Sequence, residues 1–165
     1  MILAFDVAQS CGWAAFDSGT LKAYGAIRLA KADPLINLEK LRGLFDGWAT
    51  REGEANHMLT GLGGVFVEGV AFSRFRDAHA SYWRVRTLIE IVAAEHGCYP
   101  VTEVNTSTLK KWATNNGRAS KAEMCAAARE RFSVDLYART DDVKKGSKAQ
   151  EDQADAILVG AWAND

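Results

Sequence analysis

Near its start the sequence reads Ile2-Leu3-Ala4-Phe5-Asp6-Val7, a short apolar run with one carboxylate inside it. A run of this length, bounded by polar and turn residues, predicts a buried β-strand. An unpaired carboxylate buried in such a strand is costly in free energy. Asp6 therefore needs a partner or a cation.

Three further acids lie in comparable surroundings. The apolar residues 65–67 predict a second buried strand, which ends at Glu68. Asp152 and Asp155 are three residues apart in a predicted helix over residues 150–162, so both lie on one helix face. Like charges at that spacing repel each other unless a positive charge lies between them.

Four carboxylates from two strands and one helix form an all-oxygen ligand set, which suits hard cations such as Mg²⁺ or Mn²⁺. Two such ions, roughly 3.5–4 Å apart, can activate a water and stabilise the leaving oxygen of a phosphodiester. Taken singly, each acid has a simpler interpretation. Asp6 can accept turn amides, Glu68 can be a strand-end residue, and the two aspartates can be a charge pair at a helix N-terminus. The joint placement of all four favours the metal site.

The order of apolar runs and turn signals predicts one α/β domain over residues 1–165. An antiparallel three-strand meander comes first, with Gly12 and Gly19 between its strands, and strands then alternate with helices. This order predicts a mixed five-stranded sheet with helices on both faces. The predicted strands are 2–7, 13–16, 21–29, 65–68 and 99–104, and the predicted helices start at Asp33-Pro34, at 77, at Asn105 or Ser107, at Ser120 and at 150.

Charge is distributed unevenly along the chain. The net charge is −1, but residues 101–148 carry ten Lys and Arg against six Asp and Glu, a local charge of +4. Such a segment permits a phosphate-binding face, although charged helix faces are also commonly just solvated.

The sequence shows no basic leader followed by a long apolar stretch. No apolar run is as long as a membrane span, which needs about 18 residues. We therefore expect neither a signal peptide nor a membrane span. Cys11, Cys98 and Cys125 are far apart and lack zinc-ligand spacing, which favours free thiols in a reducing cytoplasm.

Four stretches together resemble the RNase H-like nuclease superfamily and, within it, the RuvC-type Holliday-junction resolvases. Residues 4–13 are similar to the family's opening strand, with its aspartate and a turn glycine, Gly12. The other three are Val65-Phe66-Val67-Glu68, Asp152-Gln153-Ala154-Asp155-Ala156 and the basic segment from Leu109-Lys110-Lys111 to Asn116-Gly117-Arg118-Ala119-Ser120-Lys121. The chain departs from the family at Val7-Ala8, where Pro-Gly is frequent, which suggests a divergent, phage-type member.

The resemblance implies a homodimeric, structure-selective DNA endonuclease that resolves branched DNA by paired nicks in a bacterial or phage-infected cell. It implies two Mg²⁺ ions per site, with Mn²⁺ as a substitute, held by Asp6, Glu68, Asp152 and Asp155. Lys121 would act in catalysis by holding a phosphate. The expected DNA contacts are Lys110, Lys111, Arg118, Lys121, Arg74, Arg76, Lys144, Lys145, Lys148, Phe72 and Phe75.

Two further expectations concern the predicted helix 77–96. Arg84 and Arg86 extend the arginine run after Glu68 that could follow a DNA backbone. The same helix is the expected dimer contact, through the stripe Ala78, Tyr82, Val85, Ile89 and Val92, unless that stripe only covers the chain's own sheet.

Other functions of the same fold class stay open. One alternative is a related nuclease that cuts RNA–DNA hybrids or flaps, and another is a non-catalytic nucleic-acid-binding module. The clustered acids argue against the second, because a binder gains nothing from carboxylates that face phosphate. A sugar-kinase or actin-type ATPase is excluded by the length of 165 residues and by the lack of glycine-rich phosphate loops.

Overall fold

The structure is a computed structural model that describes the chain except residues 9, 32, 50–61, 71–75 and 137–146. Its sheet has the strand order β3-β2-β1-β4-β5. The first three strands pair antiparallel, while β1, β4 and β5 run parallel to one another. The predicted mixed five-stranded sheet is confirmed, with strands β1 (Ile2–Asp6), β2 (Ser10–Asp17), β3 (Thr20–Arg28), β4 (Gly64–Glu68) and β5 (Thr102–Val104).

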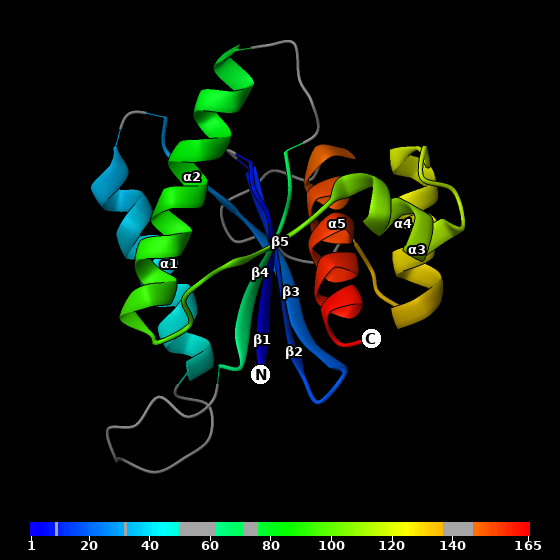
Figure 1. The fold of residues 1–165 in the computed structure, drawn as a ribbon, viewed down its shortest axis with the longest axis horizontal. Helices are drawn as coiled ribbons and strands as arrows, with labels where there is room; N and C mark the ends of the chain where they lie inside the picture. The colour runs from blue at the N-terminus through cyan, green and yellow to red at the C-terminus, as the bar shows by residue number, and fades with distance from the viewer. Residues whose placement is uncertain (9, 32, 50–61, 71–75, 137–146) are drawn as a thin grey trace.

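Helices cover both faces of this sheet, as predicted (Figure 1). The helices α1 (Pro34–Ala49) and α2 (Arg76–Glu95) lie on one face. The helices α3 (Thr106–Thr114), α4 (Lys121–Phe132) and α5 (Ser147–Ala163) lie on the other. No helix in the described ranges is long and apolar enough to cross a bilayer.

Strand β1 contributes to the two hydrophobic cores in alternation, because successive side chains of a strand point to opposite faces. Leu3 and Phe5 pack into the core under α1 and α2. Ala4 packs into the core under α3, α4 and α5. The strand is therefore buried on both faces, which explains its continuous apolar run. The three thiols, Cys11, Cys98 and Cys125, are buried and free.

Local sequence signals set the helix starts. The Asp33 carboxylate accepts hydrogen bonds from the amides of Leu35 and Ile36 at the start of α1. Asn105, one of the two predicted caps, accepts from the amides of residues 107 and 108. Ser120 and Glu123 form the predicted capping box of α4.

Three predicted starts differ from the structure by three residues, and one of them is that of strand β2, which begins at Ser10 rather than at residue 13. Strand β5 starts at Thr102 rather than at residue 99. Pro100 has no amide to donate to a ladder, which accounts for the later start. Helix α5 starts at Ser147, earlier than the predicted residue 150, and this places Lys148 within its first turn.

Candidate metal centre

Two of the four predicted acids meet because two neighbouring strands are parallel. Asp6 ends β1 and Glu68 ends β4, and Phe5 is in register with Val67. The carboxyl ends of parallel strands share one edge of the sheet, so the side chains of Asp6 and Glu68 extend from the same edge. The sequence order alone had separated these residues by more than sixty positions.

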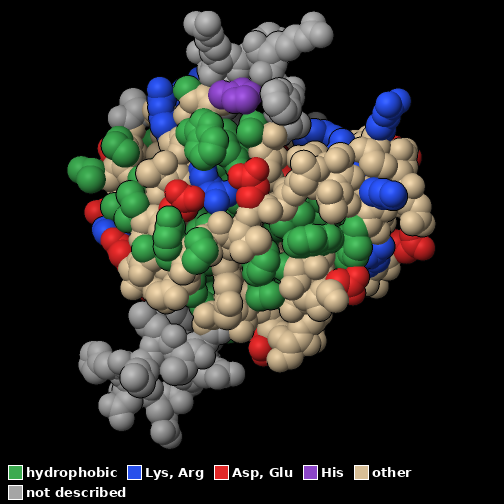
Figure 2. All heavy atoms as spheres, viewed as in Figure 1, with side chains coloured by type: hydrophobic (Ala, Val, Ile, Leu, Met, Phe, Trp, Pro, Cys, Tyr) green, Lys and Arg blue, Asp and Glu red, His purple; other side chains and the backbone are tan. Residues whose placement is uncertain are grey.

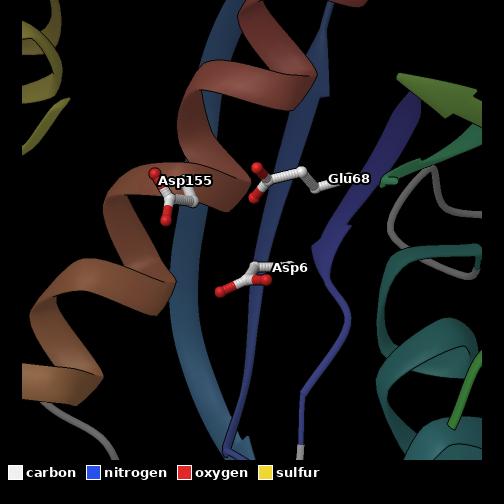
Figure 3. Close-up of side chains that lie close together, drawn as sticks. All are labelled: Asp6, Glu68 and Asp155. Atoms are coloured by element: carbon white, nitrogen blue, oxygen red, sulfur yellow. The ribbon is translucent and has the colours of Figure 1, made fainter. Parts of the chain in front are cut away.

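Helix α5 brings Asp155 to this edge. One carboxylate oxygen each from Asp6, Glu68 and Asp155 lies within 4.8 Å of the others. Figure 3 shows the three side chains directed toward a common space. We call these three residues the acidic triad.

Glycines allow α5 to approach the sheet so closely. Gly12 lies in β2, in register with Asp6, and a Cβ at this position would overlap the backbone carbonyl of Asp152. The expectation that Gly12 forms a turn is therefore wrong, since it is a strand residue at a close backbone approach. Gly160 has a similar role farther along α5, where a Cβ would overlap the ring of Phe16.

Asp152 is also buried, but it does not join the triad. Its side chain is 0 % exposed, and Oδ1 accepts a hydrogen bond from Lys148 Nζ at 3.0 Å. Oδ2 is buried with no hydrogen-bond partner among the described residues. The charge of Asp152 nevertheless contributes to the raised pKa values of all three triad acids, so it lies in the same electrostatic environment.

Burial dominates the electrostatics of the triad. It raises the pKa of Asp6 well above the usual range for an aspartate, and the charges of Glu68 and Asp155 raise it further. Burial, followed by the charge of Glu68, raises the pKa of Asp155 to about 7. Burial also raises the pKa of Glu68, against the opposing effects of a hydrogen bond with Thr106 and of the charges of Lys121 and Lys110. Three carboxylates this close do not all ionise without a compensating cation.

The donor set fits a hard divalent cation. All candidate ligand atoms are carboxylate oxygens, and Asp152 Oδ2 adds a buried oxygen that no donor among the described residues satisfies. Mg²⁺ and Mn²⁺ prefer such oxygen ligands. A bound cation would also remove the repulsion that raises the pKa values of the triad.

Lys121 lies at the edge of the triad. Its Nζ is 3.2 Å from Glu151 Oε2 and 4.0 Å from Asp155 Oδ2. Burial lowers the pKa of Lys121, but the carboxylates of Asp155 and Glu151 outweigh that effect, and the pKa is raised overall. Lys121 is therefore a positive charge held beside the acids at neutral pH.

A pocket of about 450 Å³ contains the triad. Three lysines from three different helices line it, namely Lys110 of α3, Lys121 of α4 and Lys148 of α5. The acids and the lysines thus face the same space. Acidic and basic side chains are also interspersed on the face of the molecule shown in Figure 2.

The other predicted DNA contacts divide into two groups. Lys111 and Arg118 are exposed, and neither lines the pocket. Five other predicted contacts lie outside the described residues, namely Phe72, Arg74, Phe75, Lys144 and Lys145. Arg76 is described only in its backbone.

Arg86 corrects the expectation of an arginine run along DNA. Its side chain is buried, pairs with Glu90 and Glu103, and donates to the carbonyl of Val101. It ties α2 to the start of β5 and cannot reach a ligand. The run of arginines in the sequence gave no sign of this, because burial depends on the packing of α2 against the sheet.

The expected dimer stripe on α2 is corrected as well. Tyr82, Val85, Ile89 and Val92 are buried in the core of their own chain and are not free for a partner. Ala78 is described only in its backbone. Of the large hydrophobic side chains on α2, those that are exposed are Trp83 and Ile91.

Sequence reasoning missed several residues of the site, of which Glu151 and Tyr82 are examples. Glu151 pairs with Lys121, and it could have been found because it lies one helical turn before Asp155. Tyr82 lines the pocket, and its hydroxyl donates to Glu103 at 3.2 Å. No local sequence signal distinguishes Tyr82 from the other apolar residues of α2.

No protein-family model and no curated protein sequence matches the chain. Solved structures do match. The structure of Thermus thermophilus RuvC is 14% identical, with a TM-score of 0.65 over 98% of this chain and 94% of that one. T. thermophilus RuvC in complex with Holliday junction substrate is 15% identical, with a TM-score of 0.66 over 99% and 94% of the two chains.

The yeast mitochondrial Holliday junction resolvase is similar too. It is 11% identical, with a TM-score of 0.59 over 99% of this chain and 77% of that one. At these identities the likeness concerns the fold. The chain has the fold of RuvC, and the predicted RNase H-like fold class is confirmed.

Proposed function

We propose that this chain is a divalent-metal-dependent DNA endonuclease that resolves Holliday junctions and other branched DNA by paired nicks. The observation that carries the proposal is the acidic triad within a pocket lined by three lysines. The RuvC fold supports the same conclusion, since T. thermophilus RuvC, which shares this fold, has been solved with a Holliday junction substrate.

Asp6, Glu68 and Asp155 would hold the first cation, and the buried Asp152 would complete a second cation position. Divalent ions held in this way supply an activated water nucleophile and stabilise the leaving oxygen of a phosphodiester. The carboxylates would orient this chemistry by fixing their oxygens at the edge of the sheet, where α5 packs against Gly12.

The lysines would bind the substrate's phosphates. Lys121 lies beside Asp155, where its ammonium can neutralise negative charge that develops on the phosphate under attack. Lys110 lines the same pocket from α3 and can hold a neighbouring phosphate. This division of charge explains how a chain with a net charge of −1 can bind a polyanion.

A homodimer is part of the proposal. Resolving a junction takes two nicks on opposing strands, and each chain carries one acidic triad among its described residues. A symmetric dimer would present two triads to one junction, whose own symmetry it would match. The exposed Trp83 and Ile91 of α2 are the side chains that we would place at its interface.

The test is a cleavage assay with purified protein on end-labelled four-way, three-way, flap and linear DNA and on an RNA–DNA hybrid, with and without Mg²⁺. We expect Mg²⁺-dependent paired nicks that are most frequent in the four-way junction. Preferential cleavage of the hybrid would replace the proposed substrate by RNA–DNA. Binding of junctions without cleavage in Mg²⁺ or Mn²⁺ would refute the proposed endonuclease activity.

A further inference from the structure

Asp152 combines two features that rarely occur together. Its Oδ1 pairs with Lys148, four residues earlier on α5, while its Oδ2 is buried without a hydrogen-bond partner among the described residues. Buried polar atoms normally have a partner, because a group removed from water loses its solvation. This oxygen can therefore take a ligand, one helical turn before Asp155 of the triad.

Lys148 faces two environments at once. Its ammonium contacts Asp152, which is 0 % exposed, yet the lysine side chain is itself 65 % exposed and lines the pocket. Because the Asp152 carboxylate is buried, it loses this ammonium at a large cost unless another positive charge takes its place. The exposed side chain of Lys148 can rotate into the pocket without any change in the helix, so the exchange of Lys148 for another cation needs no movement of the backbone.

We propose that Lys148 holds the place of a second cation at Asp152, so that the two cation positions fill in order. The first cation binds at Asp6, Glu68 and Asp155, where Lys121 Nζ lies 4.0 Å from Asp155 Oδ2, a longer distance than the 3.0 Å between Lys148 Nζ and Asp152 Oδ1. The second binds at Asp152 only after Lys148 has moved away. An ammonium and a divalent cation repel each other, and the repulsion is strong where burial limits screening by water and salt.

This inference rests on the proposed function, because it assigns an order to the ions of that same site. In the proposed enzyme, a substrate phosphate that enters the pocket is the anion that would accept the displaced Lys148. Substrate entry would thereby favour the second cation, and the free protein would be held in a state with one ion.

The experiment measures Mn²⁺ binding to the full chain without nucleic acid, by the electron paramagnetic resonance signal of the free ion. We expect one ion to bind to the wild type before a much weaker second one. Lys148→Met keeps the length of the side chain and removes its charge, and it should tighten the second ion by at least about tenfold. Adding Asp152→Asn to Lys148→Met should abolish the gain, because the second ion then loses its carboxylate.

Lys110→Met is the matched control. It removes a positive charge from the same pocket without breaking the ion pair of Asp152, and it should change the second affinity by less than about threefold. Lys148→Gln provides a second neutral variant, and thermal unfolding checks that each variant is folded. An unchanged second affinity in both Lys148 variants would overturn the inference, as would an equal gain in Lys110→Met.

Failure of the proposed function would look different. In that case the wild type would bind no Mn²⁺ even at the triad, or it would bind the ions in the stated order and cut no branched nucleic acid. Ordered binding without cleavage would support the proposed role of Lys148 and would refute the proposed nuclease function.

Discussion

Asp152 and Asp155 lie three residues apart on α5, and each is next to a different lysine. Asp155 contributes to the acidic triad, with Lys121 Nζ at 4.0 Å, while Asp152 is held by Lys148 at 3.0 Å. One helical turn thus separates a carboxylate that faces two other acids from one that is paired with a lysine of its own helix. A carboxylate's place in a motif therefore does not decide its electrostatic state.

The largest expected difference between the two pairs is catalytic. Asp155→Asn should lower cleavage of a four-way junction by about 10²–10³-fold, the scale of losing one charge-stabilising group in an active site. Binding should persist, because it depends on the lysines. A single-turnover cleavage assay and a gel-shift titration measure the two effects.

Glu151→Gln is the control for Asp155→Asn, since Glu151 pairs with Lys121 from the same helix but lies outside the triad. It should lower cleavage by less than about tenfold. Equal losses in both variants would mean that the triad is not the catalytic group.

Gly12→Ala should disturb both pairs together. The added Cβ would overlap the backbone of Asp152 and force α5 away from β2. Overpacking of this kind costs about 1–3 kcal/mol. For a chain of this size, that corresponds to a fall in Tm of roughly 3–10 °C.

Gly19→Ala provides a comparison for Gly12→Ala, because a Cβ at Gly19 would meet no atom within 4 Å although its φ is positive. The Mg²⁺-induced rise in Tm should shrink in Gly12→Ala and persist in Gly19→Ala. A full Mg²⁺ response in Gly12→Ala would show that α5 can shift without losing the site.

Measuring the thermal stability of the metal-free protein against pH should reveal the contribution of the triad to the free energy of unfolding. The folded-state pKa of Asp155 is raised to about 7 from its ordinary value of 3.8, so the folded form binds the proton more tightly. This contribution to stability is fully present below about pH 4 and is lost as the pH rises through 7. Metal-free protein should therefore unfold more easily at pH 8 than at pH 5 as far as this group is concerned.

Asp155→Asn resembles the protonated state of this carboxyl. It should raise the metal-free Tm at pH 8 by about 5 °C, while Mg²⁺ should stabilise the wild type and have little effect on the variant. Differential scanning calorimetry with chelator or with Mg²⁺ measures both effects. A lower Tm for Asp155→Asn in chelator at pH 8 would contradict the assigned cause of the pKa shift.

Lys121→Ala should have the smallest of the four effects. Loss of one phosphate contact should reduce the slope of log affinity for DNA against log salt by about 0.9. Lys111→Ala is the matched comparison, because Lys111 is exposed and does not line the pocket. Identical slopes for the two variants would remove the distinction between lysines in the pocket and lysines on the surface.

The sequence by itself determined the order of the elements and most of their ends. Asn105, Ser120 and Glu123 act on amides within a few residues of themselves, so their capping roles can be read locally. Asp6 and Glu68 were recognisable for the same reason, since Asp6 lies inside an apolar run and Glu68 ends one. Local chemistry was sufficient wherever the interacting groups are close in the chain.

Only the tertiary structure decided which acids meet and which cations neutralise them. The separation of Asp155 from Asp152, the burial of Arg86 and the role of Gly12 at a close backbone approach all depend on how α2 and α5 pack on the sheet. Each involves segments far apart in the chain, whose distance and relative rotation no local pattern specifies. The strength of an ion pair also depends on burial, because water screens the same charges outside the core, and burial exists only once the helices have packed.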